Sequence, residues 1–245
     1  MSDKKRFRKL WSVLLAALLV LPGGAFAQSP EKAPSKAFSQ EQLDQLLAPI
    51  ALYPDSLLTQ ILMASTYPLE VAKASSWVKQ NKELKGDALT KALEKQEWDP
   101  SVKSLVNFPQ VLQMMSDKLD WTQKLGDAFL AQQKDVLATV QTLRAKALEA
   151  GNLKTTKEQK VVVEQNPQII LIQQASPEVI YVPAYNPTVV YGVWAYPAYP
   201  PYPVYPPGYV VGAVAVGVAW GYACGHSTYH GGAVNINYNQ NTNIN

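Results

Sequence analysis

The chain has 245 residues, with 22 Lys and Arg against 19 Asp and Glu and a formal net charge of +3 at pH 7. Charge is unevenly spread, because residues 179–245 contain no Asp, Glu, Lys or Arg. Only one arginine, Arg144, follows residue 27, so no basic stripe is present to neutralise phosphates, and we expect no nucleic-acid partner. A single cysteine, Cys224, excludes an internal disulfide.

The first 27 residues have the pattern of a secretory signal. Basic residues at positions 4–9 precede the apolar run LWSVLLAALLVL at residues 10–21, and Ala25-Phe26-Ala27 offers a signal-peptidase site. We predict cleavage after Ala27 and export to the periplasm or outer envelope of a bacterium; an uncleaved N-terminal anchor is the alternative. Cleavage leaves 17 Lys and Arg against 18 Asp and Glu, a net charge of −1.

A polar lead, residues 28–37, is followed by a predicted all-helical domain over residues 38–153. Ser39 and Gln42 form a capping-box pattern, and Gly151-Asn152 suits a left-handed helix end. Further boundaries are predicted at turn and proline signals. Helix starts are predicted at Pro54-Asp55, at Thr66 with Pro68, at Asp99-Pro100 and at Phe108-Pro109. Gly86 is predicted to close the third helix and Asp87 to cap the fourth. The last helix is predicted over residues 127–150.

After residue 153 the helical spacing of apolar residues gives way to short runs of β-branched residues, which are separated by turn signals. Runs at residues 161–165, 169–173, 179–182 and 188–193 alternate with Asn166-Pro167, Ser176-Pro177 and Asn186-Pro187. Four such strands are too few to be stable alone, so we predict a small antiparallel β unit, residues 154–193, packed on the helices. The fold class is therefore α+β, ending in a low-complexity tail.

The tail begins with four Tyr-Pro-x triplets within residues 194–209. A period of three matches the polyproline II helix, which would place Tyr196, Tyr199, Tyr202 and Tyr205 on one face. We predict these tyrosines as a partner-binding stripe, since aromatic-lined grooves bind such segments. A stiff spacer between the body and the rest of the tail is the alternative reading.

Two further low-complexity segments complete the chain. Residues 210–233 are rich in Gly, Ala and Val and alternate large with small side chains, which predicts a strand; small-xxx-small spacings offer a helical alternative. Residues 234–245 carry six alternating asparagines, suited to pairing with an exposed sheet edge or with another copy, although a polar disordered tail has the same composition. We expect association with a membrane, with a protein partner or with the chain itself.

Cys224, His226 and His230 are the candidate metal ligands, because thiolate and imidazole suit zinc or copper. No carboxylate lies nearby, and three ligands need a fourth, so the primary prediction is no cofactor, with zinc or copper as the alternative. Carboxylate pairs such as Glu94/Glu97 and Asp117/Asp120 fit solvated helix faces better than a glycosidase site. Catalysis is therefore not the favoured prediction.

Five blocks, in order, resemble a bacterial exported family defined by domain of unknown function 3300. They are LLAPIALYPDSLLTQIL at residues 46–62, TYPLEV at 66–71, WDPSVKSLVNFPQVL at 98–112, WTQKLGDAFLAQQ at 121–133 and EVIYVPAYNPTVVYG at 178–192. The resemblance implies an envelope protein with a helical front and a β-rich rear. It implies no catalytic residue, cofactor or ligand.

Three hypotheses about function follow. The first is a non-catalytic, exported envelope protein whose tail attaches it to membrane, wall or a protein partner. The second is a metal-binding or sensing protein that uses Cys224, His226 and His230. The third is a cell-wall-acting enzyme that uses carboxylates of the helical domain.

Overall fold

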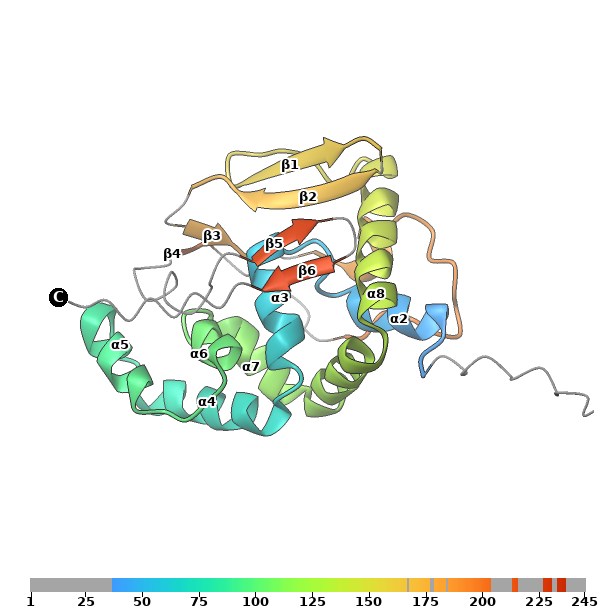
Figure 1. The fold of residues 1–245 in the computed structure, drawn as a ribbon. Helices are drawn as coiled ribbons and strands as arrows, with labels where there is room; N and C mark the ends of the chain where they lie inside the picture. Colours follow the sequence, from blue (N-terminus) through green and yellow to red (C-terminus); the bar gives the residue numbers. More distant parts are fainter. Residues whose placement is uncertain are drawn as a thin grey trace, which may run out of the picture. The chain divides into compact units, whose positions relative to one another are not determined.

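The computed structural model describes residues 37–166, 168–176, 179–183, 185–203, 213–215, 227–230 and 233–236. Helices come first along the chain and short strands follow, as Figure 1 shows, which confirms the α+β class. The predicted signal segment lies outside the described residues. The helices of the body are α2 (Gln40–Leu47), α3 (Asp55–Ala64), α4 (Pro68–Gln80), α5 (Gly86–Glu94), α6 (Pro100–Leu105), α7 (Pro109–Asp117) and α8 (Leu119–Glu149).

Local capping signals set most of these helix starts. Ser39 Oγ accepts from the Gln42 amide at 3.4 Å while the Gln42 side chain accepts from the Ser39 amide at 2.8 Å, so the predicted capping box is present. Asp99 caps α6 by accepting from the Ser101 amide at 2.8 Å. Proline occupies the first turn of α4, α6 and α7, where its missing N–H costs no hydrogen bond.

The boundary predicted at Gly86 differs in the structure. Helix α4 already ends at Gln80, and Gly86 is the first residue of α5, with φ +53°. A turn in which the Leu84 amide donates to Asn81 O separates the two helices. The positive φ explains why this residue is a glycine. The glycine, however, begins a helix, whereas the prediction had it end one.

Helix α8 is longer than predicted and kinked. It begins at Leu119 and continues through Gln132, whose φ of −142° and ψ of 46° are not helical. The Gln132 side chain accepts from the Phe38 amide at 2.6 Å and donates to Phe38 O at 3.2 Å, so the chain before α2 fastens the kink. The helix ends before Gly151, whose φ of +74° confirms the predicted left-handed position.

Close packing of α8 on the end of α3 depends on Gly126. A Cβ built on Gly126 would lie 2.3 Å from Ser65 O and 2.6 Å from Ser65 C. Only a residue without a side chain fits against that backbone. Within the described residues, no helix is both long and apolar enough to cross a membrane.

Three strand pairs follow the helices in the part of the chain that the structure describes. Strand β1 (Gln159–Glu164) pairs antiparallel with β2 (Ile169–Gln174), from Gln159 opposite Gln174 to Glu164 opposite Ile169. Strand β3 (Val179–Tyr181) pairs with β4 (Ala213–Ala215), and β5 (Ser227–His230) pairs with β6 (Ala233–Ile236), both antiparallel.

The predicted fourth strand at residues 188–193 is not a strand. Residues Pro187–Val190 form the short helix α9. The side chain of Asn186 accepts from the Thr188 amide at 2.9 Å, and Pro187 takes the first helical position. These local signals outweigh the β propensity of the Thr-Val-Val run.

One hydrophobic cluster joins the helices to the strands. Its helical members include Leu47, Ile61 and Leu143, each with no exposed surface. Strand β2 adds Ile170 and Ile172, which are 1% and 0% exposed. Residues of β3 and of the segment that follows also belong to this cluster, namely Ile180, Val182, Val190 and Tyr191. The β2 region therefore packs on the helices as part of a single core.

Candidate functional site

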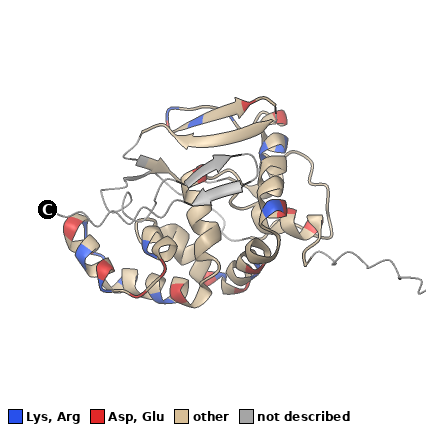
Figure 2. Ribbon diagram, viewed as in Figure 1, with Lys and Arg blue, Asp and Glu red and all other residues tan. Residues whose placement is uncertain are grey.

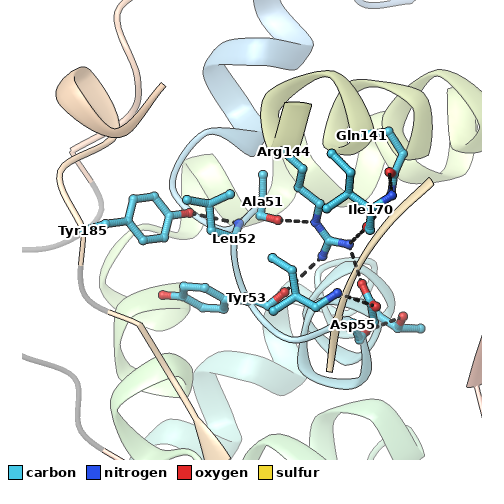
Figure 3. A network of polar contacts seen from close by, with 10 residues as sticks. Ala51, Leu52, Tyr53, Asp55, Gln141, Arg144, Ile170 and Tyr185 are labelled. Carbon is cyan, nitrogen blue, oxygen red and sulfur yellow. Dashed lines mark hydrogen bonds and ion pairs between the residues drawn. The ribbon is translucent and has the colours of Figure 1, made fainter. Parts of the chain in front are cut away.

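The most polar feature of the core surrounds Arg144, whose side chain is fully buried (Figure 3). Its Nε donates to Ala51 O at 2.8 Å and one terminal nitrogen donates to Tyr53 O at 3.0 Å. The other terminal nitrogen donates to Asp55 Oδ1 at 2.5 Å and to Ile170 O at 2.8 Å. The guanidinium therefore joins α8, the segment before α3 and strand β2.

Side chains also satisfy the edge of β2 that faces away from β1. Asp55 Oδ2 accepts from the Ile172 amide at 3.0 Å. Gln141 accepts from the Ile170 amide at 2.7 Å and donates to Ile170 O at 3.2 Å. Asp55, Gln141 and Arg144 thus take the place of a neighbouring strand, which protects this edge from pairing with another chain. We call these three residues the edge clasp.

A cluster of tyrosines holds the segment between α2 and α3 from the other side. Tyr185 and Tyr191 both donate from their hydroxyls to Ala48 O, at 2.9 and 2.6 Å, and the Leu52 amide donates to the Tyr185 hydroxyl at 3.4 Å. Tyr185 stands edge-on to Tyr53, with ring centroids 6.4 Å apart. Burial raises the pKa of both Tyr185 and Tyr191 well above the ordinary tyrosine value, so both phenols stay neutral.

Arginine, carboxylate and phenol groups are common catalytic groups, but here their polar atoms bind the chain's own backbone. Both Asp55 oxygens accept hydrogen bonds, and three of the four Arg144 hydrogen bonds end on main-chain carbonyls. Buried polar groups that are satisfied in this way rigidify a core. The arrangement acts as a structural fastening between distant segments.

We expected the Tyr-Pro segment to form a continuous polyproline II helix. In the structure its first part turns and packs against the body. The Tyr199 amide donates to Tyr196 O at 2.9 Å, a reverse turn. The Trp194 indole donates to Tyr196 O and Tyr199 O at 3.1 and 3.0 Å. The Nζ atom of Lys146 lies 6.0 Å from the Trp194 ring centroid and 5.8 Å from that of Tyr196.

Tyr202 continues this contact along α2 and α8. Its amide donates to Gln45 O at 3.4 Å, and the Gln45 side chain donates to Pro200 O at 2.7 Å. The Lys124 ammonium donates to the Tyr202 hydroxyl at 3.2 Å. Tyr196 and Tyr202 are half-buried and Tyr199 is 38% exposed, while Tyr205 lies outside the described residues. The predicted stripe is therefore divided between packed and exposed rings.

The predicted metal ligands are mostly outside the described residues. Cys224 and His226 are not described, and His230 ends β5, where it pairs with Ala233. Among the residues that the structure describes, no group of three His, Cys, Asp or Glu could hold a metal ion. The carboxylate pairs Glu94/Glu97 and Asp117/Asp120 lie exposed on the surface.

Sequence reasoning missed the edge clasp and the two buried tyrosines. One signal was available: Arg144 is the lone arginine after residue 27 and falls at helical spacing with the apolar residues Val136, Leu137, Val140, Leu143 and Ala147. A charge on the apolar face of a helix predicts a buried partner. The tyrosines had no such signal, because their hydroxyl partners are main-chain carbonyls remote in sequence.

Comparisons with known proteins agree with the resemblance. A family model described as "Protein of unknown function (DUF3300)" matches residues 39–245. The uncharacterized protein YacH of Escherichia coli (strain K12) is 44% identical over 225 residues, which cover 78% of this chain and 36% of the length of YacH. No solved structure matches the chain. The chain belongs to the DUF3300 family of proteins of unknown function.

Proposed function

We propose that the protein is an exported, non-catalytic component of a bacterial cell envelope, with a folded body and a C-terminal region that associates with membrane, wall or a protein partner. The observation that carries this proposal is the charge distribution, because every charged residue precedes residue 179. A long neutral region rich in Tyr, Gly, Val and Asn favours association with surfaces or with other chains.

Two features of the body support a non-catalytic role. The ionic and phenolic groups of the edge clasp and of Tyr185 and Tyr191 bind main chain, and the buried Asp44 accepts from Gln40 and Lys146. The carboxylate pairs lie exposed at the surface, with Glu94 and Asp117 in the last turns of α5 and α7, Asp120 at the start of α8, and Glu97 in the connection after α5.

The contacts of the Tyr-Pro segment suggest which residues to exclude from the proposed associating region. Residues 194–203 include Trp194 and Tyr202, which pack against the core cluster, so they belong to the body. Strand β4 further along the chain pairs with β3. A truncation that separates attachment from folding must therefore leave residues up to 203 in place, and a second truncation should also retain β4.

The test is fractionation of cells that express three chains, each with residues 1–27 in place so that the predicted signal can direct export. One runs to Asn245, one ends at Gly217 and keeps β4, and one ends at Pro203. We expect the full chain to sediment with membranes or wall and the chain that ends at Pro203 to stay soluble. If the chain that ends at Gly217 sediments, residues 204–217 are sufficient for association. If it stays soluble, residues 218–245 are required.

Thermal unfolding of each purified chain serves as the control. A soluble, cooperatively unfolding chain that ends at Pro203 shows that the body folds without the region after it. If that chain sediments as completely as the full one, the C-terminal region is not the attachment element and the proposal is wrong.

A further inference from the structure

A large groove lies at the α4–α5–α7 end of the helical body, away from the edge clasp. It has a volume of about 1050 Å³, near the upper end of the range for small-molecule pockets. The end of α4, the 81–85 connection, the start of α5 and the start of α7 form its walls. We refer to this feature as the α5 groove.

The floor of the α5 groove is apolar. Its apolar lining residues are Trp77, Val78, Leu84, Leu89, Val106 and Pro109. Trp77 is held edge-on against Trp98, with ring centroids 5.9 Å apart and an interplanar angle of 82°, so its position is fixed before any ligand enters.

Helix α5 leaves this floor incompletely covered. Of its nine residues only Leu93 is buried, and Leu89 stays half-buried at the groove. An amphipathic helix normally buries its apolar face against the core, because apolar surface exposed to water is unfavourable. A ligand with an apolar body would complete that burial.

The rim of the α5 groove is basic. Lys79, Lys82 and Lys85 line it against one acidic residue, Asp87. Within the described residues none of these lysines forms an ion pair. Figure 2 shows basic and acidic residues interspersed along α4 and α5 outside this lining. Lysine stems cover apolar surface while their ammonium groups remain in water, so the rim favours a negative group at the groove mouth.

Three other polar side chains of the groove lining are already partnered. Ser75 Oγ donates to the Gln113 side-chain oxygen at 3.4 Å, and the Gln113 amide nitrogen donates to Asp117. The Asn81 side chain donates to Trp77 O at 2.8 Å. These groups need no polar ligand atoms, so the ligand's charged group belongs at the lysine rim.

We infer that the α5 groove binds a single-chain anionic amphiphile, with the hydrocarbon chain on the apolar floor and the negative head among Lys79, Lys82 and Lys85. Charge complementarity decides between candidate occupants. The chain's own region after residue 179 is neutral and offers the three lysines no partner. This inference is independent of the proposed attachment by that region, because the groove consists of residues 75–113.

The probe is oleate below its micelle concentration, titrated calorimetrically into the full chain that starts at residue 28. We expect saturable binding of one oleate per chain that weakens as salt rises, since screening reduces attraction at an exposed lysine rim. Oleyl alcohol, which has the same chain and no charge, should bind at least about tenfold more weakly.

Variants then locate the binding site. The triple change of Lys79, Lys82 and Lys85 to Gln should weaken oleate binding about tenfold, and Leu89→Asp should abolish it. The matched control changes three exposed lysines outside the groove, Lys118, Lys134 and Lys154, to Gln and should bind like the parent. Circular dichroism checks each fold, and Leu84→Gln, a milder change in the same floor, replaces Leu89→Asp if that variant unfolds.

Three results with oleate, and one with vesicles, would overturn the inference. The results with oleate are absence of oleate binding, binding that the groove variants leave unchanged, and equal affinity for oleate and oleyl alcohol. Binding to vesicles of anionic phospholipid without binding to monomeric oleate would also overturn it, since it would assign the lysines to a membrane surface.

Discussion

Replacing Arg144 with Met tests the edge clasp most directly. Met is unbranched and adaptable, so it fills much of the space of the arginine stem without a large cavity. What it removes is the guanidinium, which is fully buried and donates four hydrogen bonds. The carbonyls of Ala51 and Tyr53 and one oxygen of Asp55 then lose this donor, while Ile170 O keeps the Gln141 side chain, which donates to it at 3.2 Å.

The expected cost follows from these unpaired groups. Breaking a buried ion pair by removing one partner costs about 3–5 kcal/mol, because the other charge stays buried without compensation. The Asp55 side chain is 18% exposed and keeps the Ile172 amide as a donor, so the lower end of that range applies here. Each buried carbonyl left without a donor adds to that penalty, by roughly 1–3 kcal/mol before relaxation or entry of water. We therefore expect Arg144→Met to lower the free energy of unfolding by about 4 kcal/mol, a large share of the ~5–15 kcal/mol typical of a domain.

Urea unfolding of the chain that starts at residue 28 measures this loss. With a slope of about 2 kcal/mol per M, the midpoint should fall by about 2 M while the slope stays constant. Lys157→Met serves as the control, since Lys157 pairs with Glu158 at 3.7 Å on the surface and its side chain is 90% exposed. That variant should keep the parent midpoint.

A double-mutant cycle then separates the ion pair from the carbonyl contacts. Combining Arg144→Met with Asp55→Leu removes both charges, so the double variant should lose at least about 1.5 kcal/mol less than the two single losses added together. An Arg144→Met loss below about 1 kcal/mol, or strict additivity, would refute the claim that the clasp stabilises the core through this pair.

Three further outcomes are expected. Gly126→Ala should destabilise by about 2 kcal/mol in urea unfolding, because a Cβ 2.3 Å from Ser65 O forces a backbone shift that outweighs the gain in helix propensity; an increase in stability would show that the helices can separate freely. Tyr185 and Tyr191 have raised folded pKa values, so their contribution is complete below about pH 10 and is lost as pH rises above it. The double change to Phe should therefore flatten the loss of stability between pH 10 and 12, and an unchanged slope would contradict the burial argument. Asn186→Ala should cost about 1 kcal/mol and speed amide exchange at the start of α9, whereas unchanged exchange would show that its side-chain cap is dispensable.

Helix starts were the part of the fold most accessible from sequence. The caps at Ser39 and Asp99 bind amides two or three residues further along the chain, so the cap and its partner are both visible in a short stretch of sequence. The first-turn prolines act through their own backbone. The same kind of signal, Asn186-Pro187, explains the error at residues 188–193, where β propensity was given more weight than a helix cap. Both observations concern interactions that are local in the chain.

The Tyr-Pro segment shows where periodicity stops being sufficient. Its period of three fits a polyproline II helix, which makes no internal hydrogen bonds and therefore bends readily toward better partners. Contacts with Gln45, Lys124 and Lys146 supply such partners, and the chain turns between Tyr196 and Tyr199. None of these contacts could be predicted from the repeat.

The sequence by itself determined the α+β class, the family and the absence of charged side chains after residue 178. These depend on composition, short-range caps and ordered motif blocks, all of which can be seen along one chain. Only the tertiary structure decided that Arg144 reaches Ala51, Asp55 and Ile170, which lie 93, 89 and 26 residues away. The reason is physical: the partners are mostly main-chain carbonyls, which every residue has and which become specific only when folding brings them together.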